Sequence, residues 1–180
     1  MAYLNKMKVE LKSIKHCQAL SHETNAFTAK VYVNGKHVGD AENAGHGGPT
    51  HVQTAWKGKK DEQGCPIYSD ADKEAVDKLH KWAEKNNEYD IEGLIEDLLM
   101  EELWWRDFTK DKRTKLLYLR EGSVWFISRK GIPASRIKSG ELEGELKKTK
   151  WWKPEYVFLN NVKKPEFIAK YKEAWIGGNK

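Results

Sequence analysis

Glycine and histidine residues gather in one short stretch, Asn43-Ala44-Gly45-His46-Gly47-Gly48-Pro49-Thr50-His51. Glycine adopts backbone conformations that other residues avoid, and successive N–H groups in such a turn can form an anion-binding nest. Imidazoles beside a nest suit phosphate binding or proton transfer. The stretch therefore predicts a ligand or partner loop, formed by Asn43, Gly45, His46, Gly47, Gly48 and His51. The alternative is that the glycines only shape a turn.

Known catalytic and cofactor motifs are incomplete here. Gly45-x-Gly47 is followed by Thr50 where a dinucleotide fingerprint has its third glycine, and the chain contains neither a P-loop nor a G-x-S-x-G elbow. A zinc site needs three or four converging ligands, and the histidines and Cys17 have no familiar metal spacing. A sheet could, however, bring the glycine loop beside the bend at residues 21–24. We expect no metal and no cofactor. The alternative interpretation is a small enzyme, metal-assisted or nucleotide-processing, built on His46, His51 and the glycine loop.

A second candidate surface lies toward the C-terminus, where basic and aromatic residues are interleaved. Basic side chains release counterions from a phosphate backbone, and aromatic rings stack on bases, so this composition suits nucleic acid. The alternative is that the tryptophans pack on a sheet with lysine stems lying over them. The candidate residues are Arg129, Lys130, Arg136, Lys147, Lys148, Lys150, Trp151 and Trp152.

Charge is distributed unevenly along the 180 residues. Residues 1–60 carry a net charge of +5, residues 61–108 carry −10, and residues 109–180 carry +10. The acidic middle can pair internally with the basic parts, or the basic C-terminal part can face an anionic partner. Acidic helices can also mimic nucleic acid toward a protein.

The spacing of apolar residues predicts the strands and helices that position the candidate site residues. Alternation predicts strands at residues 8–14 and 27–33, and Asn34-Gly35 predicts a tight hairpin turn into a return strand at residues 37–41. A polar stretch then continues to Ser69. Helical spacing predicts helices at residues 70–86 and 90–108, with their carboxylates on the outside.

The C-terminal part returns to strands. Residues 116–119 and 124–127 predict a second hairpin, residues 156–159 a short strand, and Pro165 the start of a helix, whereas residues 131–149 carry no clear pattern. We therefore predict an α+β fold: an antiparallel sheet from the N-terminal and C-terminal hairpins, a central acidic helical hairpin and a C-terminal amphipathic helix. Residues 1–180 are predicted to form a single domain, with the acidic helices as an insertion at about residues 69–108.

Two features predict the compartment. Cys17 and Cys65 stand far apart, which does not indicate a disulfide framework and suits a reducing environment. The sequence shows no signal peptide, and its longest nearly uncharged run is far shorter than the roughly 20 residues that a membrane span requires. We expect a cytoplasmic protein with no membrane partner.

The segment from Glu23 through Gly35-Lys36 to Asn43-Ala44-Gly45-His46-Gly47-Gly48 resembles small accessory proteins encoded by bacteriophages and other mobile elements, which share a hairpin followed by an Asn-x-Gly-x-Gly-Gly loop. The segment at residues 154–160 is similar too. The resemblance carries no assigned activity. It implies a phage protein that binds a host protein or nucleic acid in the host cytoplasm, as an inhibitor or counter-defence factor. A nucleotide- or nucleic-acid-binding protein without turnover is a further alternative.

Overall fold

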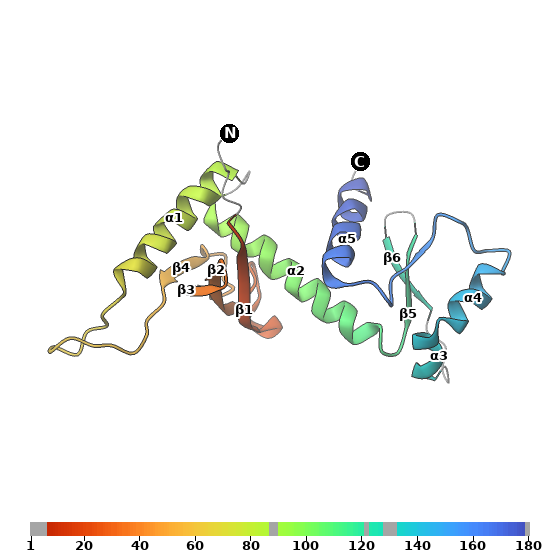
Figure 1. Cartoon of the computed structure of the whole chain (residues 1–180), viewed down its shortest axis with the longest axis horizontal. Coiled ribbons are helices and arrows are strands. Elements are labelled where there is room, and N and C mark those ends of the chain that lie inside the picture. The colour runs from red at the N-terminus through yellow and green to blue at the C-terminus, as the bar shows by residue number, and fades with distance from the viewer. Residues whose placement is uncertain (1–6, 87–89, 121–122, 128–132, 179–180) are drawn as a thin grey trace. The chain divides into compact units, whose positions relative to one another are not determined.

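The computed structural model describes residues 7–86, 90–120, 123–127 and 133–178 (Figure 1). Contacts within the chain divide it into two compact units, residues 1–100 and residues 101–180. The predicted α+β class is confirmed, because both helices and antiparallel sheets are present. The single domain over residues 1–180 stays a prediction. Across the described helices, no segment is both long and apolar enough to cross a membrane.

Unit 1 is built on a four-stranded antiparallel sheet. Its strands are β1 (Val9–His16), β2 (Phe27–Val33), β3 (Lys36–Asn43) and β4 (His51–Thr54), in the order β1-β2-β3-β4. Asn34 and Gly35 join β2 to β3 with φ angles of 50° and 81°. Two successive positive φ angles are what a type I′ turn requires, so the predicted hairpin is confirmed.

One face of this sheet is buried against helices. Phe27, Ala29, Val31 and Val33 are buried, whereas Lys30 between them is exposed, as period-two alternation requires. Helix α1 (Asp70–Asn86) packs against β3 and β4. The apolar stripes of the two helices supply the rest of the core: Val76, Leu79 and Ala83 from α1, and Ile91, Ile95 and Leu99 from α2 (Ile91–Asp111).

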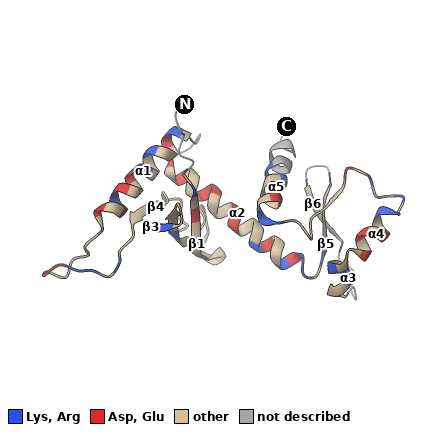
Figure 2. Cartoon of the chain, in the orientation of Figure 1, with Lys and Arg blue, Asp and Glu red and all other residues tan. Residues whose placement is uncertain are grey.

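Helix α2 begins with a cap at Asp90, the residue at which the predicted helix 90–108 starts. The Asp90 carboxylate accepts hydrogen bonds from the backbone N–H groups of Glu92 and Gly93, at 3.0 and 3.2 Å. These N–H groups have no partner inside a helix, so the cap stabilises the first turn. Along α2 the acidic positions dominate the first half and basic positions appear toward the end, as Figure 2 shows in red and blue.

One acidic side chain contradicts the expectation that the helix carboxylates lie outside. Asp72, in the first turn of α1, is completely buried. Its Oδ1 lies 2.8 Å from Lys36 Nζ, and its Oδ2 accepts a hydrogen bond from Lys57. The Lys36 and Lys57 ammonium groups hold the pKa of the Asp72 carboxyl below its ordinary value. This carboxylate therefore ties α1 both to the β2–β3 hairpin and to the segment after β4.

Residues 56–67 form a hairpin arm, all of whose residues are exposed and which extends away from the sheet of unit 1 (Figure 1). Lys60 and Pro66 form an isolated bridge, and Asp61 Oδ1 accepts the N–H groups of Gln63 and Cys65. Sequence periodicity predicted only a polar stretch here. Strand β4 has four residues, of which only Val52 is strongly apolar, so its alternation is too short to identify.

Unit 2 contains a second, separate antiparallel sheet, so the two predicted hairpins do not share one sheet. Its strands are β5 (Leu116–Arg120), β6 (Ser123–Ile127) and β7 (Val157–Phe158), in the order β6-β5-β7. Its helices are α3 (Ala134–Ser139), α4 (Glu141–Lys147) and α5 (Lys164–Gly178). Helices α3 and α4 lie where the sequence showed no pattern, because each is short and Gly140, with φ of 77°, separates them.

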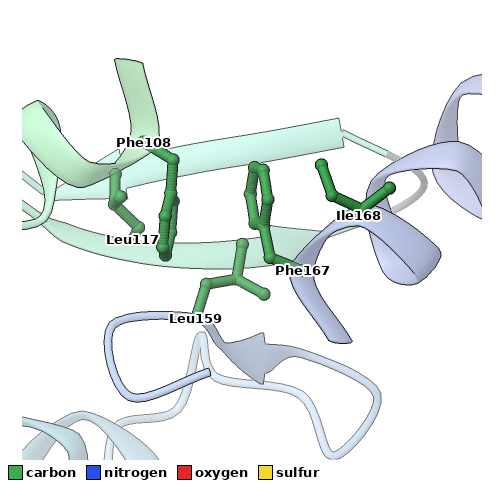
Figure 3. Packing of buried hydrophobic residues seen from close by; sticks show 5 residues of the cluster. All are labelled: Phe108, Leu117, Leu159, Phe167 and Ile168. Atoms are coloured by element: carbon green, nitrogen blue, oxygen red, sulfur yellow. The ribbon is translucent and has the colours of Figure 1, made fainter. Parts of the chain in front are cut away.

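The two faces of strand β5 contribute to two different apolar clusters. Leu117 points into a cluster with Phe108 of α2, Leu159, and Phe167 and Ile168 of α5 (Figure 3). The Phe108 and Phe167 rings stack with centroids 4.2 Å apart. Leu116, on the opposite face, packs with Ile137 of α3 and Leu142 of α4. Unit 2 is therefore a small sheet between two helical layers.

Candidate functional site

Asn43 organises the glycine loop that follows β3. Its Nδ2 donates hydrogen bonds to the Gly48 carbonyl at 2.9 Å and to Thr50 Oγ1 at 3.1 Å. Its Oδ1 accepts from the Gly45 N–H and from Thr24 Oγ1, both at 2.8 Å. A carboxamide has two N–H donors and two acceptor lone pairs. All four are used here, so the buried Asn43 side chain fixes the path of the loop.

The loop lies beside the bend at residues 21–24, the neighbour that the sequence allowed for it. The Gly45 carbonyl accepts the backbone N–H groups of His22 and Glu23, at 3.0 and 3.1 Å. Gly45 has a φ of 87°, and a Cβ there would lie 2.2 Å from the Leu20 carbonyl oxygen. Only glycine fits both the backbone angle and this close approach.

The amide groups expected to form an anion nest are partly engaged within the loop. The Gly45 N–H donates to Asn43, and the Gly47 N–H donates to Thr24 Oγ1 at 3.3 Å. Gly48 is exposed, and its carbonyl is bonded to Asn43. These bonds take two donors away from the predicted nest. The glycines therefore serve the conformation of the loop.

The two predicted histidines lie in different surroundings. His46 is exposed, and its ring stacks on that of His22, with centroids 5.4 Å apart. His51 lies opposite Glu42 in the β3–β4 register. Neighbouring residues of a strand point to opposite faces, so His51 lies on the face away from Asn43. The structure thus does not bring His46 and His51 together.

An open pocket lies where the loop, the 21–24 bend and α2 meet in unit 1. It has a volume of about 470 Å³ and is lined by Gln18, residues 21–25, Asn43, Thr50, Glu92, Gly93 and Glu96. Gln18 belongs to a short 3-10 helix, η1 (Gln18–Leu20), that follows β1. We call this hollow the acidic pocket, because its charged side chains are the carboxylates of Glu23, Glu92 and Glu96, with His22 at its side.

Hydrogen bonds hold two of the three carboxylates in place. The Thr50 N–H donates to Glu92 Oε1 at 2.9 Å. Asn25 Nδ2 donates to Glu96 Oε1, and Asn25 Oδ1 lies 3.2 Å from His16 Nε2. Each of these bonds uses one carboxylate oxygen, which leaves the second oxygen for another donor. The pocket is therefore preorganised from three separate elements.

The third carboxylate depends on the glycine loop. A Cβ on Gly47 would come within 2.1 Å of Glu23 Oε2, so the Glu23 carboxylate lies directly over this glycine. Gly47 also has a φ of 78°. Because residue 47 has no side chain, the Glu23 carboxylate can lie at the edge of the pocket.

This arrangement suits a ligand that donates hydrogen bonds or carries positive charge. Carboxylates, hydroxyls and amide oxygens converge on one hollow, and no lysine or arginine is among the described residues that line it. An imidazole near a carboxylate can also transfer a proton. Within the described ranges, no three His, Cys, Asp or Glu side chains are placed to hold a metal ion together.

Sequence reasoning missed the three glutamates. Acidic residues near the start of a helix are ordinary, because they complement the helix dipole. One signal was present: Glu92 and Glu96 are four residues apart, and like charges at this spacing destabilise an isolated helix by about 0.2–0.5 kcal/mol. They also flank the buried Ile95. In the structure each member of this pair accepts a hydrogen bond from outside the helix, which local sequence does not reveal.

The predicted basic and aromatic surface separates into distinct parts. Arg129 and Lys130 lie outside the described residues. Arg136 forms ion pairs with two glutamates of α4, and Lys147 pairs with Glu143 at 2.7 Å. Lys148, Lys150 and Trp151 are exposed, whereas Trp152 is half-buried. The packing interpretation thus applies to Trp152, which stacks on Phe158, whereas nucleic-acid contact by the exposed Trp151 stays a prediction.

Comparisons of the chain with protein-family models, with curated proteins and with solved structures find no match. Function therefore has to be inferred from the side chains themselves. In unit 1 the acidic pocket brings together polar groups from separate elements. Convergent polar groups in a concave site are the usual mark of a binding site.

Proposed function

We propose that this chain is a non-enzymatic binding protein that accepts an arginine or lysine side chain of a partner protein into the acidic pocket. The observation that carries this proposal is the convergence of Glu23, Glu92 and Glu96 on one open hollow, whose described lining residues include no lysine or arginine. A cation that enters such a hollow meets complementary charge on three sides.

The fixed orientation of the carboxylates favours a guanidinium group. Glu92 and Glu96 are each anchored through one oxygen, to the Thr50 N–H and to Asn25. A guanidinium group carries five N–H donors in a fixed planar geometry, so it can donate to the remaining oxygens of more than one carboxylate, and anchored acceptors lose little freedom on binding. The volume of about 470 Å³ also lies within the range of ligand pockets, roughly 300–1,000 Å³.

The same charges disfavour the nucleotide and enzyme alternatives. Three carboxylates repel a phosphate group, and two amides of the expected nest are engaged within the loop. His46 and His51 lie apart, so an acid–base pair built on them has no support from the geometry. Binding of a cationic protein segment requires neither a nest of free amide groups nor an acid–base pair of histidines.

The resemblance to bacteriophage accessory proteins supports a host protein as this partner, in the host cytoplasm. An arginine of the host protein that binds in the pocket would no longer be available for its own contacts. We therefore expect this chain to act as an inhibitor or counter-defence factor. The acidic character of the pocket supports a partner surface that itself carries positive charge.

The proposal can be tested with a small probe by NMR. We expect N-acetylarginine amide to shift the backbone amide signals of Asn25, Thr50 and Gly93 in the ¹⁵N-labelled protein. N-acetylcitrulline amide has nearly the same shape without the charge, and we expect it to leave these signals in place. The Glu92→Gln/Glu96→Gln variant should lose the response to arginine, because it removes the two anchored charges.

A matched control removes two charges from the other face of the sheet. Asp40 and Glu42 alternate with the buried β3 residues, so the Asp40→Asn/Glu42→Gln variant should respond to arginine as the wild type does. Equal shifts with citrulline, or a response that survives in the Glu92→Gln/Glu96→Gln variant, would refute the proposal.

A further inference from the structure

Trp151 is an exposed aromatic ring held in position by other rings. Its side chain is 44% exposed. It meets the edge of Trp152, with centroids 5.7 Å apart and an angle of 68°, and it also contacts Tyr118. Trp152 is itself stacked on Phe158 of β7, with centroids 4.2 Å apart and planes within 7°. The Trp151 ring is therefore supported by the sheet of unit 2 while part of its surface stays open.

The segment that carries this ring is fixed by its own hydrogen bonds. The N–H of Thr149 donates to the Leu146 carbonyl at 2.9 Å, and the Thr149 hydroxyl donates to the same carbonyl. The Trp152 N–H donates to the Thr149 carbonyl at 3.2 Å. Residues 148–152 thus form a tight turn after α4, and Trp151 lies on it in a defined position. A ring held in this way loses little freedom when a ligand stacks on it.

Positive charge flanks the exposed ring. Lys148 and Lys150 are exposed, and neither has an ion-pair partner among the described residues. Nearby Lys147 differs, because it pairs with Glu143. Residues 101–180 carry 19 basic and 11 acidic side chains, a net charge of +8. The ring therefore lies in a part of the chain that attracts anions.

We propose that Trp151, Lys148 and Lys150 form a platform for single-stranded nucleic acid, with a base stacked on Trp151 and phosphates at the two lysines. We call these three residues the Trp151 platform. A stacked aromatic ring beside lysines is the chemistry by which proteins hold single strands without reading their sequence. A duplex keeps its bases stacked on one another, so a single strand fits this site better.

This inference goes beyond the proposed function and does not depend on it, because the acidic pocket and the Trp151 platform share no residue. A purely apolar protein partner would use the ring without the lysines, and an anionic membrane would use the lysines without base stacking. The experiment below separates these possibilities.

The test measures fluorescence anisotropy of a labelled oligothymidine of about 12 nucleotides at low salt. We expect Trp151→Ala to weaken binding about 5- to 150-fold, the loss that corresponds to about 1–3 kcal/mol for one stacked base. Trp151→Phe should keep most of the affinity, because it retains a ring. The Lys148→Gln/Lys150→Gln variant should reduce the salt slope by about 1.4, or about 0.7 for each lost phosphate contact.

The chain offers a control in Trp56 of unit 1, which is 46% exposed but already carries the Lys60 ammonium over its ring, 5.8 Å from the centroid. Trp56→Ala should bind the oligothymidine as the wild type does. Four results would overturn the inference: no anisotropy change at low salt, equal losses in Trp56→Ala and Trp151→Ala, duplex binding as tight as single-strand binding, or Trp151-dependent binding to phosphatidylserine vesicles in place of the oligonucleotide.

Discussion

The Lys36 ammonium lies 2.8 Å from the Asp72 carboxylate, and this ion pair joins the β2–β3 hairpin to the first turn of α1. Lys57 donates to the other carboxylate oxygen. Asp72→Asn would leave two ammonium groups facing an uncharged amide. Hydrogen bonds to charged groups contribute about 1.5–3 kcal/mol each. Both lysines are about half exposed and can turn to water, so we expect the free energy of unfolding to fall by about 1–3 kcal/mol in urea denaturation.

Asp70 provides the control, two residues earlier in the same turn. Its side chain is 97% exposed and pairs with Lys73 at 3.2 Å. Exposed pairs contribute little because water and salt screen them, so Asp70→Asn should change the free energy of unfolding by less than about 0.5 kcal/mol. Similar losses in the two variants would show that burial of Asp72 is not what matters.

The same carboxylate predicts a pH dependence of stability. The lysines lower the pKa of Asp72 in the folded protein from its ordinary value of 3.8, so the ionised form stabilises the fold. This stabilisation is complete above the ordinary pKa and is lost as the pH falls through the lowered folded value. Melting temperatures of the wild type and Asp72→Asn should therefore differ by a constant amount from about pH 7 to about pH 5 and converge at lower pH. A difference that does not shrink at all as the pH falls below the ordinary pKa of 3.8 would contradict this.

Substitution by alanine should lower the stability of the protein at Gly45 but not at Gly48. Gly45 has a φ of 87°, and its Cβ would lie 2.2 Å from the Leu20 carbonyl oxygen, whereas a Cβ on Gly48 meets nothing within 4 Å. The left-handed conformation alone costs about 1–2 kcal/mol for a residue with a Cβ, and the contact with Leu20 adds to this. We expect Gly45→Ala to lower the urea midpoint clearly and Gly48→Ala to leave it nearly unchanged. A tolerated Gly45→Ala would show that the loop can be rebuilt.

Two adjacent tryptophans should also differ in their contribution to stability. Trp152 stacks on Phe158 and contacts Tyr156, so its removal leaves a gap beside β7. Trp152→Ala should lower the free energy of unfolding by roughly 3 kcal/mol, at the low end for buried aromatic residues because this ring is only half-buried. Trp151→Ala should cost less than about 1 kcal/mol. Equal costs would mean that Trp151 is part of the core.

Much of the fold could be predicted from local patterns. Periodicity and turn chemistry were enough to predict the elements whose signal lies within a few residues. These are the Asn34-Gly35 turn, the start of α2 at Asp90 and the apolar stripes of α1 and α2. Strand β4 and helix α3 were missed because their four and six residues are too few for a periodic signal. The separation into two sheets depends on long-range pairing, which local patterns do not carry.

The candidate site was predicted only in part. The sequence indicated the glycine loop and its place beside residues 21–24, but it did not indicate that α2 would bring Glu92 and Glu96 to the same hollow. The buried Asp72 was missed for a related reason, because its partners Lys36 and Lys57 lie at least 15 residues away in the chain. Charged residues that come together only through tertiary contacts cannot be recognised from the local sequence.

Every hydrogen-bonding position of the Asn43 side chain is occupied within the protein. The Asn-x-Gly-x-Gly-Gly pattern therefore indicates a loop conformation. Together with Gly45, the Asn43 side chain holds the loop in one path. Other chains that share this pattern would then share an architecture while differing in what they bind. A useful comparison among them would examine positions 23, 92 and 96, where a change of charge would signal a change of target.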